Sequence, residues 1–178
     1  MARVVRQRFA KPTKAGATPV GAFILSMKPR YYAGIGSRKT PDNVLNGMES
    51  IAEILQRKGY ILRSGGAAGA DSAFANGAED FQVFHGHDAT EDAMHLASRY
   101  HPNWEACSDY VRALHGRNMQ IVLGYTLDTP VNFIVCWTPD AQLVGGTAQA
   151  LRLAKDFAIP VFNLANQEHW WCLNESIT

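Results

Sequence analysis

The glycine-rich turn from Leu62 to Asp71, LRSGGAAGAD, is the feature that most limits how this chain can fold. The apolar run from Tyr60 to Leu62 before it is typical of a short buried strand, and a helix is predicted from about Ala70. The turn has no bulky side chain, so a ligand can approach its backbone. Free N–H groups at a helix start attract anions, but such a turn can also simply pack a strand on a helix. The turn alone leaves both interpretations open.

Strand and helix patterns alternate along the chain. Strands are predicted at residues 31–35, 60–64, 81–84, 131–136 and 159–163. Helices are predicted at residues 41–58 with Thr40 as N-cap, then at 70–78, 92–100, 103–115 with a continuation towards 124, and 147–157. Such alternation implies a parallel sheet with right-handed crossovers. The predicted fold class is α/β: a single Rossmann-like domain with a five-stranded parallel sheet, order 3-2-1-4-5, and helices on both faces.

The basic residues gather at the N-terminal end. Nine of the 17 lysines and arginines, and none of the 16 acids, lie in residues 1–41. The remaining eight basic and 16 acidic residues give the rest of the chain a formal charge of −8. Proline and glycine break any periodicity here, so residues 1–20 are predicted to be a basic, irregular arm before a nucleotide-binding domain of residues 21–178. Such an arm could contact nucleic acid or an acidic protein surface, but a solvated tail is the preferred interpretation.

The cysteines and the hydropathy point to a soluble cytoplasmic protein without a membrane partner. Cys107, Cys136 and Cys172 lack a paired or metal-like spacing, which favours a reducing compartment and packing roles. No apolar run approaches the roughly 20 residues that span a bilayer, and the N-terminus lacks the apolar core of a secretory signal. The histidines His85 and His87 resemble metal ligands, but exposed loop histidines are commoner. No metal and no cofactor are expected.

Three glycine loops each follow a predicted strand or its exit turn. They begin at Gly34, Ser64 and Gly145. In doubly wound sheets, ligands bind at the carboxyl ends of the strands where the strand order reverses. The three loops should therefore converge on one anionic ligand.

Four segments resemble the Rossmann domain of the DNA-processing protein A family. They are YAGIGSRKTP, SGGAAGADSAFANGA, HGRN and GGTAQALRLAKDFAIPVF, and they span about Tyr31 to Leu164 in the family's order. The superfamily, often called SLOG, also includes the Lonely Guy phosphoribohydrolases, nucleotide N-glycosidases and predicted nucleotide sensors. The chain is similar to its small stand-alone members from phages. The resemblance implies a nucleotide-binding Rossmann domain, and its motifs are not specific for one activity.

The resemblance also implies ligand contacts for particular residues. The binding residues it implies are Gly34, Gly36, Ser37, Arg38, Ser64, Gly65, Gly66, Gly69, His115, Asn118, Gly145, Gly146 and Thr147. Arg117 and Asp71 are the implied catalytic pair. Two alternatives stay open, because Arg117 could pair with Asp109 or Asp140 at the surface, and Asp71 could merely cap a helix.

One departure from the family bears on catalysis. In the phosphoribohydrolases the last loop reads G-G-x-G-T, and the catalytic Glu follows three residues after the Thr. Here the loop is one glycine shorter, and Ala150 stands at the place of that Glu. Hydrolysis would then need a carboxylate from Asp71, Glu79 or Asp140.

Three functions follow from these observations. The first is binding of a nucleotide or nucleoside monophosphate, with hydrolysis of its N-glycosidic bond as one possibility. The second is single-stranded DNA binding through the basic arm and Arg38, Lys39 and Arg117, which the charge of −8 on the rest of the chain opposes. The third is a non-catalytic nucleotide sensor or sponge. A homodimer is expected because residues 104–114 are predicted to place Trp104 and Leu114 on one apolar helix face, together with Cys107 and Val111.

Overall fold

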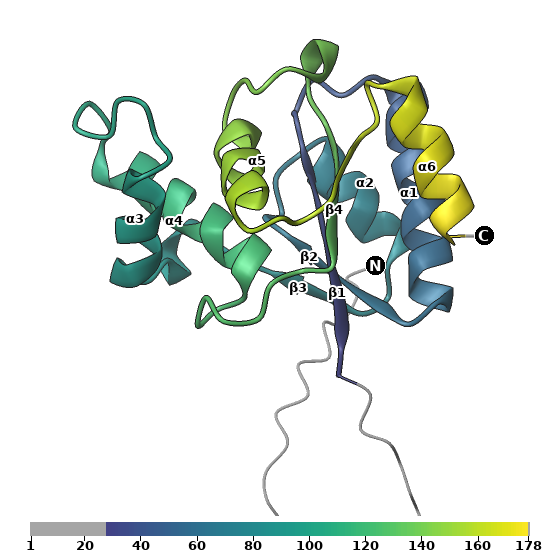
Figure 1. Cartoon of the computed structure of the whole chain (residues 1–178), viewed down its shortest axis with the longest axis horizontal. Coiled ribbons are helices and arrows are strands. Elements are labelled where there is room, and N and C mark those ends of the chain that lie inside the picture. The colour runs from purple at the N-terminus through teal and green to yellow at the C-terminus, as the bar shows by residue number, and fades with distance from the viewer. Residues whose placement is uncertain (1–27, 178) are drawn as a thin grey trace, which may run out of the picture.

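The computed structural model describes residues 28–177 (Figure 1). The predicted basic arm of residues 1–20 lies outside the described residues, as does the beginning of the predicted domain. No helix within residues 28–177 is both long enough and apolar enough to cross a membrane.

Five strands form one parallel sheet. They are β1 (Arg30–Gly36), β2 (Tyr60–Ser64), β3 (Phe81–Val83), β4 (Phe133–Trp137) and β5 (Val161–Asn163). The strand order is β3-β2-β1-β4-β5, and every neighbouring pair is parallel. In the centre, Tyr32 of β1 pairs with Leu62 of β2 and with Phe133 of β4. The predicted α/β class, the five-stranded parallel sheet and its order are confirmed.

Within residues 28–177, six helices and two short 3₁₀ turns accompany the strands, and the last helix follows β5. They are α1 (Asp42–Arg57), α2 (Ala70–Gly77), η1 (Gly86–Asp88), α3 (Glu91–Ser98), α4 (Asp109–Leu123), η2 (Pro139–Ala141), α5 (Thr147–Asp156) and α6 (Gln167–Ile177). Figure 1 shows α1, α2 and α6 on one side of the sheet, with α4 and α5 on the other and α3 outside α4. The predicted cover of helices on both faces is therefore confirmed.

Alternate residues of β1 supply the two halves of the core. Tyr32 is buried with the apolar faces of α1, α2 and α6, whereas Ala33 and Ile35 are buried with those of α3, α4 and α5. The same alternation holds in β4, where Ile134 joins the second half and Val135 the first. Both faces of these strands are apolar because both are covered by helices.

The start of α1 differs from its prediction in a way that shapes the loop after β1. Thr40 does not cap the helix, because its hydroxyl donates a hydrogen bond to the carbonyl of Ser37 at 2.7 Å. Pro41 precedes the helix instead, and its carbonyl accepts from the N–H groups of Val44 and Leu45 at 2.9 Å. Thr40 thereby closes the turn that begins at Ser37.

The prediction of a helix over residues 103–115 is wrong in its first half. Helix α4 begins after Ser108, whose hydroxyl accepts a hydrogen bond from the N–H of Val111 at 3.4 Å. Trp104 and Cys107 lie in the preceding turn and do not share a helix face with Val111 and Leu114. The expected homodimer stays a prediction, without support from that face.

The two neighbouring tryptophans of α6, Trp170 and Trp171, differ in how they pack. The indole N–H of Trp170 donates to the carbonyl of Leu164 at 2.7 Å, and its ring lies against Gly47 of α1. Trp171 is 66% exposed, so most of its surface faces solvent.

Gly77 allows α2 to approach α1 closely, which predicts a cost for any side chain there. A Cβ at Gly77 would collide with the carbonyl oxygen of Glu49 and lie 2.9 Å from the Cβ of Ala52. Because a helix backbone cannot yield locally, Gly77→Ala should lower the free energy of unfolding by about 1–3 kcal/mol in urea denaturation. Gly146→Ala is the control, since open space surrounds Gly146, and it should change this free energy by less than about 0.5 kcal/mol. Equal stability of the two variants would contradict the close helix contact.

Candidate functional site

A cleft of about 740 Å³ opens at the carboxyl ends of β1 and β4. This is the point where the strand order reverses, because β2 and β3 lie on one side of β1 whereas β4 and β5 lie on the other. The cleft is lined by residues from the loop after β1, the turn after β4, the start of α2, helix α4, and the segment that leads into α5.

The structure brings ten of the predicted site residues into this cleft. They are Gly36, Ser37, Arg38, Asp71, His115, Arg117, Asn118, Gly145, Gly146 and Thr147. Five others do not line it, and these are Gly34, Ser64, Gly65, Gly66 and Gly69. The first and third glycine loops thus meet as expected, whereas the second loop lines the cleft only with Ala67 and Asp71.

The glycines outside the cleft have packing roles. A Cβ at Gly34 would lie 2.6 Å from the ring of Phe74, under α2. Gly69 has a φ of +84°, and a Cβ there would lie 2.8 Å from the Cα of Arg38. These two positions let α2 and the loop after β1 pack together, so they shape the cleft without lining it.

The loop after β1 is closed by its own hydrogen bonds. The N–H of Ser37 donates to the carbonyl of Trp137 at 3.1 Å, and the Ser37 hydroxyl accepts from the N–H of Lys39 at 3.0 Å. Because the Ser37 N–H is already used, the loop offers a ligand mainly the exposed side chains of Arg38 and Lys39.

Asp71 anchors the second loop. Its side chain is 5% exposed, and Oδ2 accepts hydrogen bonds from the N–H groups of Gly65 at 3.1 Å and Ala67 at 3.3 Å. Burial raises the pKa of this carboxyl, while the backbone donors and the charge of Arg117 act in the opposite direction. Asp71 therefore fixes the turn over residues 65–67 and does not act as a simple helix cap.

Arg117 projects from α4 to the same turn. A Cβ at Gly65 would coincide with the Arg117 guanidinium and would lie 2.9 Å from Asp71 Oδ2. Burial lowers the pKa of Arg117, whereas the charge of Asp71 raises it, and a guanidinium stays protonated at neutral pH. The Nε atom is buried without a hydrogen-bond partner in the described chain. The surface pair with Asp109 is not formed, because Asp109 pairs with Arg112.

Two further residues of α4 reach the cleft. Asn118 donates from its side-chain amide to the carbonyl of Gly146 at 3.1 Å, which ties α4 to the loop before α5. His115 lies beside His101, with ring centroids 4.6 Å apart. Burial, followed by the charges of His101 and Arg117, lowers the pKa of His115 to about 4. The imidazole of His115 is therefore neutral at pH 7.

The third loop leaves the start of α5 open. Gly145 has a φ of +69°, and Gly146 precedes the helix without a side-chain cap or an acid in the first turn. Open space surrounds the Cβ positions of both glycines. Within residues 28–177 the N–H of Ala148 donates to the carbonyl of Gly145 at 3.3 Å, whereas those of Gly145, Gly146 and Thr147 donate to no other group, so these three donors lie free near the positive end of the helix.

Side chains of one sign dominate the cleft. Arg38, Lys39, Arg117 and Arg152 line it, and Asp71 is the one carboxylate among its described lining residues. Arg152 was not among the predicted site residues. A signal was present, because Arg152 lies four residues after Ala148, next to the predicted loop of residues 145–147, and the two residues share the face of α5 that lines the cleft. His101 was also missed, and no signal in the sequence separates it from an ordinary loop histidine.

The anchoring role of Asp71 predicts a stability loss on truncation. Asp71→Ala would leave the N–H groups of Gly65 and Ala67 without their acceptor, which should cost about 1–3 kcal/mol in urea denaturation. Asp71→Asn keeps a side-chain oxygen and should lose less. The exposed Asp80 is the control, since its replacement by Ala should change the unfolding free energy by less than about 0.5 kcal/mol. A wild-type unfolding curve for Asp71→Ala would contradict the anchoring role.

Comparison of the chain with models of protein families, with curated proteins and with solved structures gives no match. The geometry of the cleft and the four sequence segments therefore carry the functional assignment.

Proposed function

We propose that the protein binds a nucleotide or nucleoside phosphate in this cleft, as a SLOG-type Rossmann protein. The observation that carries the proposal is the charge of the lining, which has four basic side chains and one buried carboxylate. Residues 42–178 have a formal charge of −8, so the cleft is a basic site on an acidic body. Clefts lined by one sign of charge focus the potential and raise the local concentration of the opposite ion.

The phosphate is assigned to the start of α5. No N–H of Gly145, Gly146 or Thr147 donates a hydrogen bond to another group within residues 28–177. These donors and the positive end of the helix form the kind of site that binds phosphate elsewhere. Arg117 lines the same cleft and adds a charged donor, and a charge-assisted hydrogen bond is stronger than a neutral one.

The nucleoside is assigned to the apolar part of the cleft. Pro102, Leu114, Ile121, Pro139, Leu143 and Val144 line this part. Leu143 is 51% exposed and Val144 is 43% exposed, so both have apolar surface to bury against a base. A volume of about 740 Å³ falls in the range of small-molecule sites.

The contacts of Asp71 favour a sensor or sponge over a glycosidase. A glycosidase needs a carboxylate that can reach the ligand, and Asp71 already accepts two backbone hydrogen bonds in a buried position. Ala150, at the place of the family's catalytic Glu, is buried and has no ionisable group. We therefore propose binding without hydrolysis of the N-glycosidic bond.

The lining also disfavours single-stranded DNA as the ligand. Sequence-tolerant single-strand binding relies on aromatic side chains that stack on successive bases. No Phe, Tyr or Trp is among the described residues that line the cleft. Trp137, which ends β4, packs against the core on the side of α1.

Removal of the Arg117 charge should weaken nucleotide binding selectively. Arg117→Ala should lose a charge-assisted contact and lower the affinity by roughly ten- to a hundredfold, or about 1.5–3 kcal/mol. Arg117→Lys should recover only part of this loss, because an ammonium lacks the planar fork. Calorimetry with nucleoside mono-, di- and triphosphates measures the effect, and Arg57→Ala on the exposed side of α1 is the control. Binding of no nucleotide, or wild-type affinity of Arg117→Ala, would contradict the site.

Gly146→Asp should separate binding from stability. A carboxylate at a helix start interacts favourably with the helix dipole, and open space surrounds Gly146, so the variant should be at least as stable as the parent. The same carboxylate would occupy the start of α5 and repel a phosphate, so the affinity should fall by at least about tenfold. Gly146→Ala, which adds no charge, should bind within a few-fold of wild type. Unchanged affinity of Gly146→Asp would place the phosphate elsewhere.

A separate assay decides between a sensor and an enzyme. Incubation of the protein with each bound nucleotide, followed by chromatography for free base, detects hydrolysis directly. Appearance of free base would overturn the assignment as a non-catalytic protein.

A further inference from the structure

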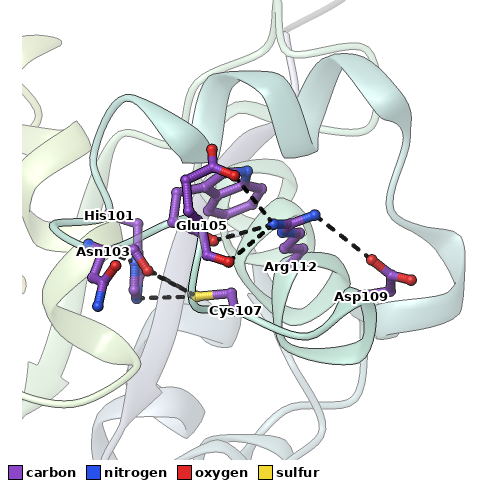
Figure 2. A network of polar contacts seen from close by, with 7 residues as sticks. His101, Asn103, Glu105, Cys107, Asp109 and Arg112 are labelled. Carbon is purple, nitrogen blue, oxygen red and sulfur yellow. Dashed lines mark hydrogen bonds and ion pairs between the residues drawn. The ribbon is translucent and has the colours of Figure 1, made fainter.

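A second group of ligand-type side chains lies at one wall of the cleft. It consists of His101, Cys107 and His115, each of which has a ligand atom within 4.8 Å of the other two. Cys107 Sγ is 3.6 Å from His101 Nδ1 and 3.7 Å from its Nε2. Figure 2 shows the Cys107 thiol directed at the His101 ring. Within residues 28–177 no other three such residues come together in this way.

The turn between α3 and α4 brings the three residues together. His101 and Cys107 lie in this turn, whereas His115 lies on α4. The N–H of Asn103 donates to His101 Nδ1 at 3.2 Å and orients the ring. The N–H of Cys107 donates to the carbonyl of Trp104 at 3.0 Å, which fixes the backbone that carries the thiol.

Arg112 holds this turn on α4. Its Nη2 atom lies 3.5 Å from the carbonyl of Trp104 and 3.4 Å from that of Glu105, and donates to both. It also forms ion pairs with the carboxylates of Glu105 and Asp109 at 3.7 Å (Figure 2). Both acids thus face Arg112, and the ligand-type groups of the cluster are a thiol and two imidazoles.

One atom of the cluster is buried without a partner. The Nδ1 atom of His115 is out of contact with solvent and has no hydrogen bond in the described chain. Most buried polar atoms in proteins do have a partner, so such an exception needs an explanation. A bound ion in the cluster would supply one.

The spacing agrees with tetrahedral metal coordination. Zinc binds sulfur at about 2.3 Å and imidazole nitrogen at about 2.0–2.1 Å. Two such ligands at the tetrahedral angle lie about 3.5 Å apart. Because His101 Nδ1 accepts from Asn103, Nε2 is the nitrogen left for the ion, and its separation of 3.7 Å from Cys107 Sγ needs little adjustment.

We propose that His101, Cys107 and His115 bind a zinc ion at the wall of the cleft. One thiolate and two neutral imidazoles suit zinc, and the thiol releases its proton on binding. Three protein ligands leave a fourth position, as in sites that exchange water for a ligand. His101 and His115 also line the cleft, and the bound ion would add one net positive charge there. Metal binding does not depend on a nucleotide. A phosphate oxygen of a bound nucleotide would take the fourth position, and this part of the proposal rests on the proposed function.

Cobalt is a direct probe of the thiolate. The full chain, stripped of metal with a chelator and kept reduced, should bind equimolar Co²⁺ and show a thiolate-to-cobalt charge-transfer band that Zn²⁺ abolishes. Cys107→Ser should lose this band, and His115→Gln should weaken Zn²⁺ binding by at least about tenfold in chelator competition. Cys172→Ser is the matched control because Cys172 is an exposed thiol on α6, and its band should be unchanged.

A measurement on the wild-type chain covers the case in which a variant does not fold. Zn²⁺ should slow alkylation of Cys107 and leave the rate at Cys172 unchanged. Absence of a cobalt band, a band that persists in Cys107→Ser, or equal alkylation of Cys107 with and without Zn²⁺ would overturn the proposal. These experiments contain no nucleotide, so their outcome is independent of the calorimetry.

Discussion

The close contact between the loop after β1 and the start of α2 is the constraint on which the cleft depends. A Cβ at Gly36 would lie 2.7 Å from the Cβ of Ala70, and one at Gly69 would lie 2.8 Å from the Cα of Arg38. Only very small residues permit this approach. It places Arg38 and Asp71 in the lining of the same cleft, although Arg38 lies in the loop after β1 and Asp71 in the first turn of α2.

The fold was predictable because the apolar pattern within each short segment of the sequence indicates whether that segment forms a strand or a helix. Strands covered on both faces are apolar along their whole length, and β4 has this pattern. The error at residues 103–108 has a local cause. Their apolar spacing is compatible with a helix, but Ser108 caps α4, and Arg112 in the first turns of α4 binds the carbonyls of Trp104 and Glu105, so these residues form a turn before the helix.

The site was predictable only in part, because a glycine in a sequence does not show what surrounds it. Gly34 and Gly69 contact neighbouring elements closely, whereas Gly145 and Gly146 have open space. All four look alike in the sequence, yet only the last two line the cleft. The role of His101 could not be predicted from the sequence for a similar reason, because its position beside His115 depends on the turn between α3 and α4.

Asp71 links the architecture of the cleft to its chemistry. A carboxylate that acts on a ligand must be free to move a proton or to face a developing charge. Asp71 Oδ2 is instead held by Gly65 and Ala67, and its charge faces Arg117. If Asp71 turned to a ligand, two buried N–H groups would lose their acceptor, at a cost of about 1–3 kcal/mol. The bonds that build the cleft thus oppose any turn of Asp71 towards a ligand, and this cost favours the proposed role of Arg117 as the charged group that binds the anion.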